Sequence, residues 1–283
     1  MEMLEKLNES IQYIESNLNG EIQYEKAAQI ACCSVYHYQR MFSYIAGIPL
    51  SEYIRNRRLT KAAFDLQAGD KVVDVALRYG YESPTAFNRA FRKMHYVSPS
   101  VAKKEGTFLK ACPPISFKIT IKGVGEMKYS IIKNEEIRIV GVKAPLTKNI
   151  DENFKFVPKL WEKSAEDGSI NNIVSIMNED SKGMLGVSVC MDSLDNWEYY
   201  LAAKTDKDVP KGMHEYIIPA GTWAVFPGEG PMPKSIQEIE KRIITEWFPT
   251  SGYEYADAPD IELYLNQDPT NAKFEVWIPI RKK

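Results

Sequence analysis

A set of five residues occurs twice in the first hundred positions of this 283-residue chain, at the same relative spacing. Each copy reads as a short helix, a turn and a second helix that begins at Ser, which accepts hydrogen bonds from free backbone N–H groups. An Ala inside the first helix lets the two helices pack closely. The repeat therefore predicts two helix-turn-helix motifs, marked by Ala27, Ser34, Tyr38, Arg40 and Phe42 and by Ala76, Ser83, Phe87, Arg89 and Phe91.

The second helix of each motif has one apolar and one polar face at helical spacing. The apolar residues are Tyr38, Met41, Phe42 and Ile45 in the first copy and Phe87, Ala90, Phe91 and Met94 in the second. Gln, Asn and Arg side chains can reach base edges in a major groove, and Ser and Thr can bind phosphates. A generic helical hairpin would bury the same aromatics, but it would not predict matched Gln-Arg and Asn-Arg pairs. We therefore expect DNA contacts from the outward residues Tyr36, Gln39, Arg40, Ser43, Thr85, Asn88, Arg89 and Arg92.

The segment between the two copies predicts a helical spacer from Ser51 to Gly69, with a basic side formed by Arg55, Arg57, Arg58 and Lys61. A rigid spacer would fix the distance between the two reading helices, and one turn of DNA, about 34 Å, is the natural spacing. Residues 40–104 hold 12 Lys or Arg against 5 Asp or Glu, whereas residues 111–283 hold 21 against 26. This asymmetry favours a basic half that meets an anionic partner, and the alternative is an ordinary solvated surface.

Residues 32–42, CCSVYHYQRMF, also invite a metal or thiol interpretation. Adjacent Cys32 and Cys33 point to different sides of a helix end, and the sequence has no second Cys/His pair at ligand spacing. We therefore predict that the two cysteines close the first helix and fill the turn, that Ser34 caps the next helix, and that His37 belongs to the recognition helix. No metal and no cofactor are expected.

Composition restricts the class of protein. Apolar content of 44% and charged content of 26% are typical of soluble globular proteins, and no apolar run is long enough to span a bilayer. The N-terminal residues MEMLEKLNES lack a basic-then-apolar signal pattern, and four scattered cysteines do not form a disulfide framework. These features predict a cytoplasmic protein without a membrane partner.

Residues 4–108 resemble the two subdomains of an AraC/XylS-type DNA-binding domain. The resemblance is carried by AAQIACCSVYHYQRMFSYIAGIPLSEYIRNRRLTKAA and by VVDVALRYGYESPTAFNRAFRKMHYVSPS. It implies a seven-helix unit that places two recognition helices in successive major grooves of double-stranded DNA and activates transcription. It also implies that Tyr36, Gln39 and Arg40 read DNA from the first helix, and Thr85, Asn88 and Arg89 from the second.

From about Ile115 the chain becomes rich in β-type sequence, and a linker is expected over 109–126. We expect strands at 137–144, 185–192, 197–204, 215–220, 222–228, 261–266 and 274–280, with helices beginning near Asn153 and spanning 235–247. The predicted fold class is an all-α N-terminal domain (1–108) with two helix-turn-helix motifs. It is followed by an α+β C-terminal domain (127–283) built from a duplicated strand-helix-strand-strand unit.

The strand IELYLN, residues 261–266, carries a carboxylate between aromatic and apolar positions. Its alternation places Ile261, Leu263 and Leu265 on one face and Glu262 with Tyr264 on the other. A carboxylate among aromatic rings attracts a desolvated cation. The alternatives are an exposed Glu on an amphipathic strand and aromatic residues that belong to the core.

Residues 127–283 resemble a gyrase-inhibitor-like (GyrI-like) effector-binding domain, most distinctively in GTWAVF and PDIELYL. The resemblance implies that Glu262 lies in a central aromatic-lined pocket that takes hydrophobic, often cationic, small molecules. Candidate lining residues are Trp223, Trp161, Tyr199 and Tyr264. The two domains together are similar to Rob-like regulators, which implies a ligand-responsive transcription factor rather than an enzyme. A ligand would then act through domain arrangement or through recruitment of RNA polymerase.

Two other functions stay open. The C-terminal domain could hydrolyse reactive electrophiles, with Glu262 and a Tyr activating water, or it could be a protein-binding module with a vestigial pocket. The three histidines, His37, His95 and His214, do not form a Ser/His/Asp or Cys/His set, which argues against nucleophilic catalysis.

Overall fold

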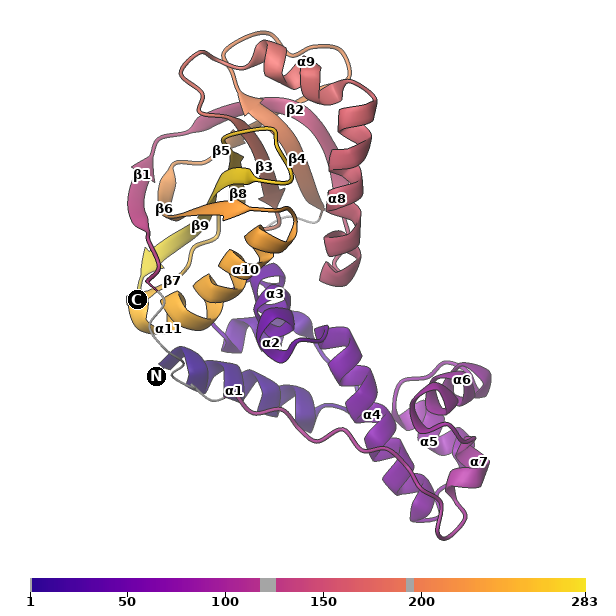
Figure 1. The fold of residues 1–283 in the computed structure, drawn as a ribbon. Coiled ribbons are helices and arrows are strands. Elements are labelled where there is room, and N and C mark those ends of the chain that lie inside the picture. The colour runs from indigo at the N-terminus through magenta and orange to yellow at the C-terminus, as the bar shows by residue number, and fades with distance from the viewer. Residues whose placement is uncertain (1, 118–125, 192–195) are drawn as a thin grey trace. The chain divides into compact units, whose positions relative to one another are not determined.

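The computed structural model describes residues 2–117, 126–191 and 196–283. Contacts group the described residues into two units (Figure 1). The first unit is made from residues 1–31 and 46–120, and the second from residues 32–45 and 121–283. The segment 32–45, which the sequence assigns to the first helix-turn-helix motif, is therefore grouped with the C-terminal part of the chain.

The first unit is helical, as the sequence predicts. The long helix α4 packs against α5, α6 and α7, and α1 packs against α2. Apolar residues at helical spacing, including Leu59, Leu66, Phe87 and Phe91, form the core between α4 and the later helices. The helices are α1 (Glu2–Ser16), α2 (Tyr24–Ile30), α4 (Leu50–Gln67), α5 (Val72–Arg78), α6 (Pro84–His95) and α7 (Pro99–Ala102).

Helix α6 begins as its sequence predicts. The Ser83 hydroxyl accepts a hydrogen bond from the backbone N–H of Ala86 at 3.2 Å, and Pro84 occupies the first helical position. Before it, Gly80 adopts a φ of 79°, which a residue without a Cβ reaches easily. The turn between α5 and α6 is therefore fixed by local chemistry.

Arg57, on the basic side of the predicted spacer, has a structural role. Arg57 is 6% exposed and binds both carboxylate oxygens of Glu15, with Nε–Oε1 and Nη2–Oε2 distances of 2.8 and 2.7 Å. The Tyr53 hydroxyl donates to the same Glu15 at 2.8 Å. Burial raises the pKa of Glu15, but these hydrogen bonds and the Arg57 charge outweigh it and keep the pKa below its usual value. Arg57 thus joins α4 to α1, and the expectation that it belongs to an outward basic side of the spacer is wrong.

The described part of the predicted linker, residues 109–117, is bound to the helical unit. The Cys112 N–H donates to Thr60 Oγ1 at 3.0 Å, and the Ile115 N–H donates to the Tyr53 hydroxyl at 3.2 Å. Phe117 exchanges two backbone hydrogen bonds with the Asn8 side chain, at 2.8 and 3.1 Å. The remainder of the predicted linker falls mostly on residues 118–125, outside the described residues.

The second unit is an α+β domain around an antiparallel sheet. Among the described residues nine strands take part, in the order β1-β6-β9-β8-β3-β4-β2-β5, with β7 paired to β9. Their bounds are β1 (Ser130–Asn134), β2 (Ile137–Leu146), β3 (Met184–Val189), β4 (Trp197–Lys204), β5 (His214–Ile218), β6 (Gly221–Gly230), β7 (Tyr253–Tyr255), β8 (Asp260–Tyr264) and β9 (Ala272–Lys282).

The sheet order confirms the predicted duplication. The first copy contributes β2, β3 and β4, the second contributes β6, β8 and β9, and the two copies meet where β3 pairs with β8. The strand that precedes each copy pairs with the first strand of the other copy, β1 with β6 and β5 with β2. The centre of the sheet is therefore the junction between the two copies.

Helices of the second unit cover the sheet. Helix α9 packs on β2 and β4, and α10 packs on β6 and β9. The predicted helix over 235–247 is α10 followed directly by one π-helical turn. The sequence did not predict β1, β7, α9 or α11, and the predicted strand over 185–192 ends at Val189, with residue 192 outside the described residues. The helices are α3 (Val35–Ala46), α8 (Ile150–Glu166), α9 (Ser169–Ile176), α10 (Lys234–Arg242), η1 (Ile243–Trp247) and α11 (Phe248–Ser251).

Candidate functional site

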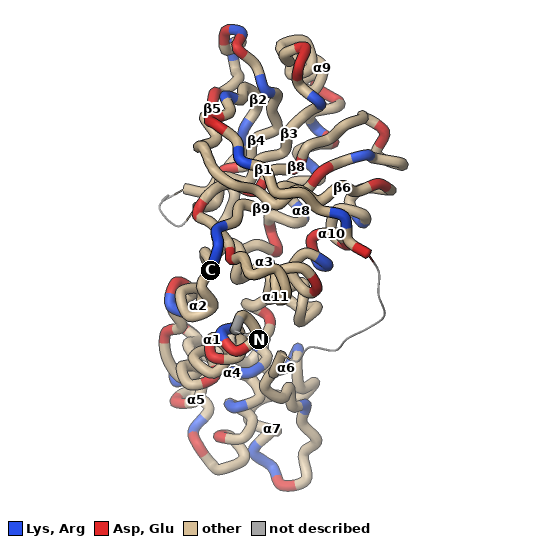
Figure 2. Tube along the Cα trace, turned by 90° about the vertical axis from the view of Figure 1, so that its left-hand side faces the viewer, with Lys and Arg blue, Asp and Glu red and all other residues tan. Residues whose placement is uncertain are grey.

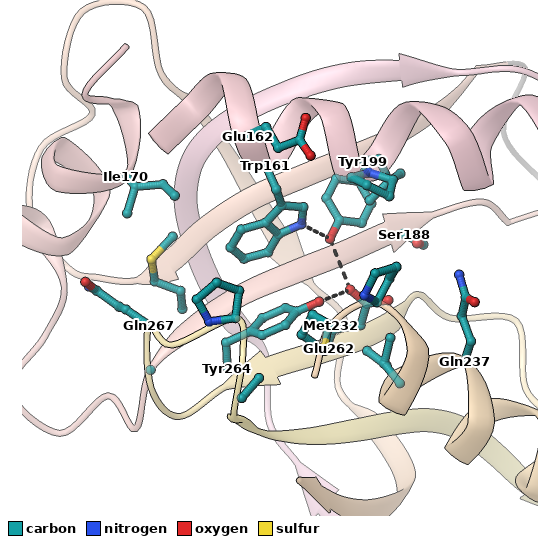
Figure 3. Close-up of a pocket in the computed structure, with 18 of the residues that line it drawn as sticks. Trp161, Glu162, Ile170, Ser188, Tyr199, Met232, Gln237, Glu262, Tyr264 and Gln267 are labelled. Carbon is teal, nitrogen blue, oxygen red and sulfur yellow. Dashed lines mark hydrogen bonds between the residues drawn. The ribbon is translucent and has the colours of Figure 1, made fainter. Parts of the chain in front are cut away.

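A cavity of about 700 Å³ lies in the second unit, above the centre of the sheet. Residues of α8, α10 and α3 form its walls, and residues of β3, β4 and β8 form its floor. The lining is mostly apolar, with a few polar side chains that converge near the middle (Figure 3). A cavity of this size and composition is typical of a site for a drug-sized ligand.

The predicted ligand residues meet in a chain of hydrogen bonds. The Trp161 indole N–H donates to the Tyr199 hydroxyl at 2.9 Å, and that hydroxyl donates to Glu262 Oε2 at 3.1 Å. The Tyr264 hydroxyl donates to the same oxygen at 2.8 Å (Figure 3). The rings of Trp161 and Tyr264 are in edge contact, with centroids 4.6 Å apart. The carboxylate of Glu262 is thus held by two hydroxyls among three aromatic rings.

Strand alternation explains why β8 presents this carboxylate. Ile261 and Leu263 are buried in the core on one side of the strand, so Glu262 and Tyr264 face the cavity on the other. Leu265, which the alternation assigned to the apolar face, lies beyond the end of β8 and is 40% exposed. The predicted alternation of buried and cavity-facing residues is therefore confirmed within β8.

A glycine that the sequence interpretation missed makes the hydrogen-bond chain possible. Gly186 on β3 pairs with Glu262 on β8, and Tyr199 on β4 pairs with Ser188, two residues along β3. The Tyr199 side chain leans across the position of Gly186, because a Cβ there would lie 2.1 Å from the Tyr199 hydroxyl and 3.0 Å from Glu262 Oε2. Because Gly186 has no side chain, the Tyr199 hydroxyl and the Glu262 carboxylate have room to meet above it.

The environment of Glu262 makes its charge sensitive to what enters the cavity. Burial raises the pKa of this carboxyl to about 7, and the nearby charge of Glu240 adds to the effect. The hydrogen bonds from Tyr264 and Tyr199 and the charge of Arg40 act in the opposite direction. A group of this kind is neutral or charged near neutral pH according to its neighbours, so a cation in the cavity would favour its ionised form.

Trp223 is the predicted ligand residue that the structure does not bring to the cavity. Its side chain is fully buried in the sheet core, and its indole N–H donates to the carbonyl oxygen of Pro259 at 3.2 Å. The residue lies on β6, away from the strands that form the cavity floor. Trp223 therefore belongs to the core of the sheet, and the expectation that it lines the cavity is wrong.

The polar face of α3 is buried, which corrects the expected exposure of this helix. Tyr36, Gln39 and Arg40 are 6%, 5% and 7% exposed, and Ser43 is partly buried. The Gln39 side chain donates to the backbone oxygen of Lys148 at 2.9 Å. Tyr36 contacts Trp197 edge to face, with ring centroids 5.5 Å apart. The expectation that these residues face outward is wrong in this state, and their contact with DNA stays a prediction.

Ion pairs with two distant carboxylates hold this face of α3 in place. Arg40 Nη1 donates to Asp260 Oδ2 at 2.6 Å, and Arg40 Nη2 donates to Glu240. His37 Nε2 lies 3.0 Å from Asp260 Oδ1, and the His37 ring stacks on Tyr255 at 3.9 Å between centroids. Burial raises the pKa of Asp260, but His37 and Arg40 outweigh that effect and keep the pKa below its usual value.

Helix α6 has the exposed polar face that the sequence predicts for a DNA-reading helix. Thr85, Asn88, Arg89 and Arg92 are exposed, whereas Phe87 and Phe91 are fully buried. Lys and Arg residues are interspersed with Asp and Glu along the helical unit (Figure 2), and Arg92 and Lys93 are basic residues in the last turn of α6. The contact of these four residues with DNA stays a prediction.

The Cys-His cluster at 32–37 has no metal-site geometry. The Ser34 hydroxyl accepts a hydrogen bond from the His37 backbone N–H at 3.2 Å, which is the predicted helix cap. Within residues 2–117, 126–191 and 196–283, no three His, Cys, Asp or Glu side chains come together as a possible metal-binding group. Over the same residues, every helix is too short or too polar to cross a bilayer.

Family models match both parts of the chain. A model described as a GyrI-like small molecule binding domain matches residues 127–281, and a helix-turn-helix domain model matches residues 27–105. The transcriptional activator AarP of Providencia stuartii is 36% identical over 102 residues, covering 36% of this chain and 76% of AarP. This chain is an AraC-family transcription regulator with a GyrI-like domain. It is therefore a DNA-binding protein whose second domain belongs to a small-molecule-binding family.

Relatives of full length share the same order of domains. The right origin-binding protein of Escherichia coli (strain K12) is 24% identical over 289 residues, covering 95% of this chain and 96% of that protein. The HTH-type regulator YbfP of Bacillus subtilis is also 24% identical, with the same coverage. A solved structure of SAV2435 bound to tetraphenylphosphonium aligns with a TM-score of 0.48 and 22% identity, covering 55% of this chain and 94% of that one. The named relatives are regulators and DNA-binding proteins, which favours this class over the hydrolase alternative.

Proposed function

We propose that this AraC-family regulator is a one-component sensor that activates transcription when a lipophilic cation enters the cavity at Glu262. The observation that carries the proposal is the carboxylate of Glu262, which is enclosed by the rings of Trp161, Tyr199 and Tyr264. Aromatic faces and a carboxylate both attract a cation that has lost its water, and the apolar lining suits large hydrophobic substituents.

For DNA binding, α3 and α6 would each enter one of two successive major grooves of the same duplex. The polar face of α6 is free to do so in the described structure. Two covalently joined reading helices are sufficient for a single chain to bind DNA. The similarity to the activator AarP supports recruitment of RNA polymerase, which takes place in the cytoplasm. The hydrogen-bonded cavity also favours ligand sensing over a vestigial protein-binding module, because a module without a ligand would not need a buried carboxylate.

The experiment that tests the proposed function is selection of bound sequences from random duplexes by the full-length chain, followed by footprinting. We expect two protected segments about 34 Å apart along one face of the duplex. Tetraphenylphosphonium should change the occupancy of the selected duplex, whereas tetraphenylborate, an anion of the same shape, should not. A single protected segment would contradict the use of two reading helices, and equal effects of the two ions would contradict cation sensing.

A further inference from the structure

One wall of the cavity belongs to the first predicted recognition helix. Tyr36, Arg40 and Tyr44 follow one another at four-residue spacing on α3, so they share one helical face, and all three line the cavity. The same Tyr36 and Arg40 are predicted to read DNA. The same face of α3 therefore lines the cavity in the structure and is predicted to enter a major groove when DNA is bound.

Arg40 provides the positive charge at this wall. Its guanidinium bridges Glu240, which lines the cavity, and Asp260, which does not. Glu240 also accepts a hydrogen bond from the Tyr44 hydroxyl, so its carboxylate is bound entirely by α3 in the contacts described. If α3 left, Glu240 would be an acidic group of the cavity without its cation, and an unpaired charge in such a site is costly.

The docked arrangement of α3 is also incompletely satisfied. Within the described part of the chain, Arg40 Nε is buried and has no hydrogen-bond partner. A buried N–H without a hydrogen-bond partner destabilises the state that buries it, because it has lost its bonds to water. This destabilisation makes the docked state easier to displace than a fully paired interface would be.

We propose that Glu240 is a second cation subsite of the cavity, that Arg40 of α3 occupies it when no ligand is bound, and that a lipophilic cation and α3 compete for it. The inference rests on the proposed function, since it takes the cavity as a cation site. Glu240 and Glu262 line the same cavity, and two cations held between them in a low-dielectric space repel each other. The charges of Glu240 and Arg40 also both act on Glu262, with opposite signs, after the larger effect of burial.

The consequence is a coupling between ligand and DNA with a defined sign. A cation that displaces Arg40 frees the face of α3, which makes Tyr36, Gln39 and Arg40 available to DNA. Because such coupling is reciprocal, DNA that binds this face should raise the affinity for the cation by the same factor. The face of α3 then binds either the cavity or the duplex, and a bound cation shifts this equilibrium towards the duplex.

The substitution Asp260→Asn tests the competition without replacing a residue that lines the cavity. Asp260 binds Arg40 and His37 of α3 but does not line the cavity. We expect the full-length variant to bind a selected duplex roughly tenfold more tightly than the wild type without ligand, as typical for coupling between sites. The increase on adding tetraphenylphosphonium should be correspondingly smaller. Asp180→Asn is the matched control, because Asp180 carries the same charge in an exposed pair with Lys204.

A second measurement follows α3 directly and needs no DNA. Cys190 is 3% exposed and lies close enough to Asp260 and Arg40 for their charges to influence its thiol. Release of α3 should expose this thiol, so tetraphenylphosphonium should accelerate its alkylation by iodoacetamide, measured by mass spectrometry of the peptide that contains Cys190. Tetraphenylborate should leave the rate unchanged.

The outcomes separate this inference from the proposed function. If calorimetry shows that tetraphenylphosphonium binds but neither duplex affinity nor Cys190 alkylation responds, the competition is contradicted and cation sensing is retained. If the cation does not bind, the proposed function is contradicted. In that case Asp260→Asn still tests whether docking restrains α3, since unchanged duplex affinity in a variant with wild-type circular dichroism would overturn the inference.

Discussion

Gly186 lies directly opposite Glu262 in the sheet, and a methyl group at position 186 would lie 2.1 Å from the Tyr199 hydroxyl that binds this carboxylate. The hydrogen-bond chain of the cavity therefore depends on a residue without a side chain at the junction of the two repeated units. The atoms that a side chain at position 186 would meet are the Tyr199 hydroxyl and a Glu262 carboxylate oxygen, so such a side chain would have to displace the groups that form the hydrogen bond.

The first prediction concerns this glycine. Gly186→Ala should displace the Tyr199 ring, break its hydrogen bond to Glu262 and reduce the affinity for tetraphenylphosphonium at least tenfold, equivalent to about 1.4 kcal/mol. Calorimetry on the folded variant measures the loss. Gly20→Ala is the control, because a Cβ at Gly20 meets nothing within 4 Å. Wild-type affinity in Gly186→Ala would show that Tyr199 does not need to reach Glu262.

The second prediction concerns pH. The pKa of Glu262 is raised from 4.5 to about 7 in the folded protein, so the folded state binds more protons than the unfolded state between these values. The stabilisation is complete below about pH 4.5 and is lost as pH rises through 7, by roughly 3 kcal/mol. Glu262→Gln should remove this part of the pH dependence of unfolding, measured by urea denaturation. The same slope in wild type and variant would assign the effect to other groups.

The third prediction concerns DNA. Arg89→Ala on α6 should weaken binding to a selected duplex by about 1–3 kcal/mol if the guanidinium reads a base, with relaxed sequence preference at that position. Fluorescence anisotropy at several salt concentrations separates base reading from phosphate contact, which would only lower the salt slope by about one. Arg281→Ala removes an exposed arginine of the other unit and should have no effect. Unchanged affinity in Arg89→Ala would remove α6 from the proposed interface.

The fourth prediction compares two neighbouring arginines of α4. Arg57 is buried in a bidentate pair with Glu15, whereas Arg55 is exposed and 3.9 Å from Glu52. Glu15→Ala leaves the Arg57 charge without its carboxylate and should destabilise the helical unit by about 3 kcal/mol. Arg55→Ala should change the free energy of unfolding by no more than about 0.5 kcal/mol. Thermal unfolding followed by circular dichroism measures both, and equal effects would contradict the structural role of Arg57.

Local patterns predicted much of the fold because they are properties of short segments. The cap at Ser83, the apolar stripe through Phe87 and Phe91 and the alternation at Ile261–Tyr264 each depend on neighbours within a few residues. The cavity residues Trp161, Tyr199 and Tyr264 were identified through the family resemblance, since their spacing alone also suits a core.

Other features depend on partners far away in the chain. Arg40 has the spacing of an exposed helical residue, yet Glu240 and Asp260, 200 and 220 positions later, bury it. The role of Gly186 depends on the register of β3 against β4 and β8, which places it beside Tyr199 and Glu262. Trp223 was misassigned because an aromatic residue on a strand looks the same in sequence whether it lines a cavity or fills the core.

The most direct test of the cation site is calorimetric titration of the wild-type chain and of Glu262→Gln at pH 8 with tetraphenylphosphonium and with tetraphenylborate. We expect the wild type to bind the cation and not the anion, because most Glu262 carboxyls are ionised above pH 7. Glu262→Gln should lose at least tenfold in cation affinity, about 1.4 kcal/mol. Equal binding of the two ions by the wild type, or equal cation affinity in the variant, would contradict a cation site at Glu262.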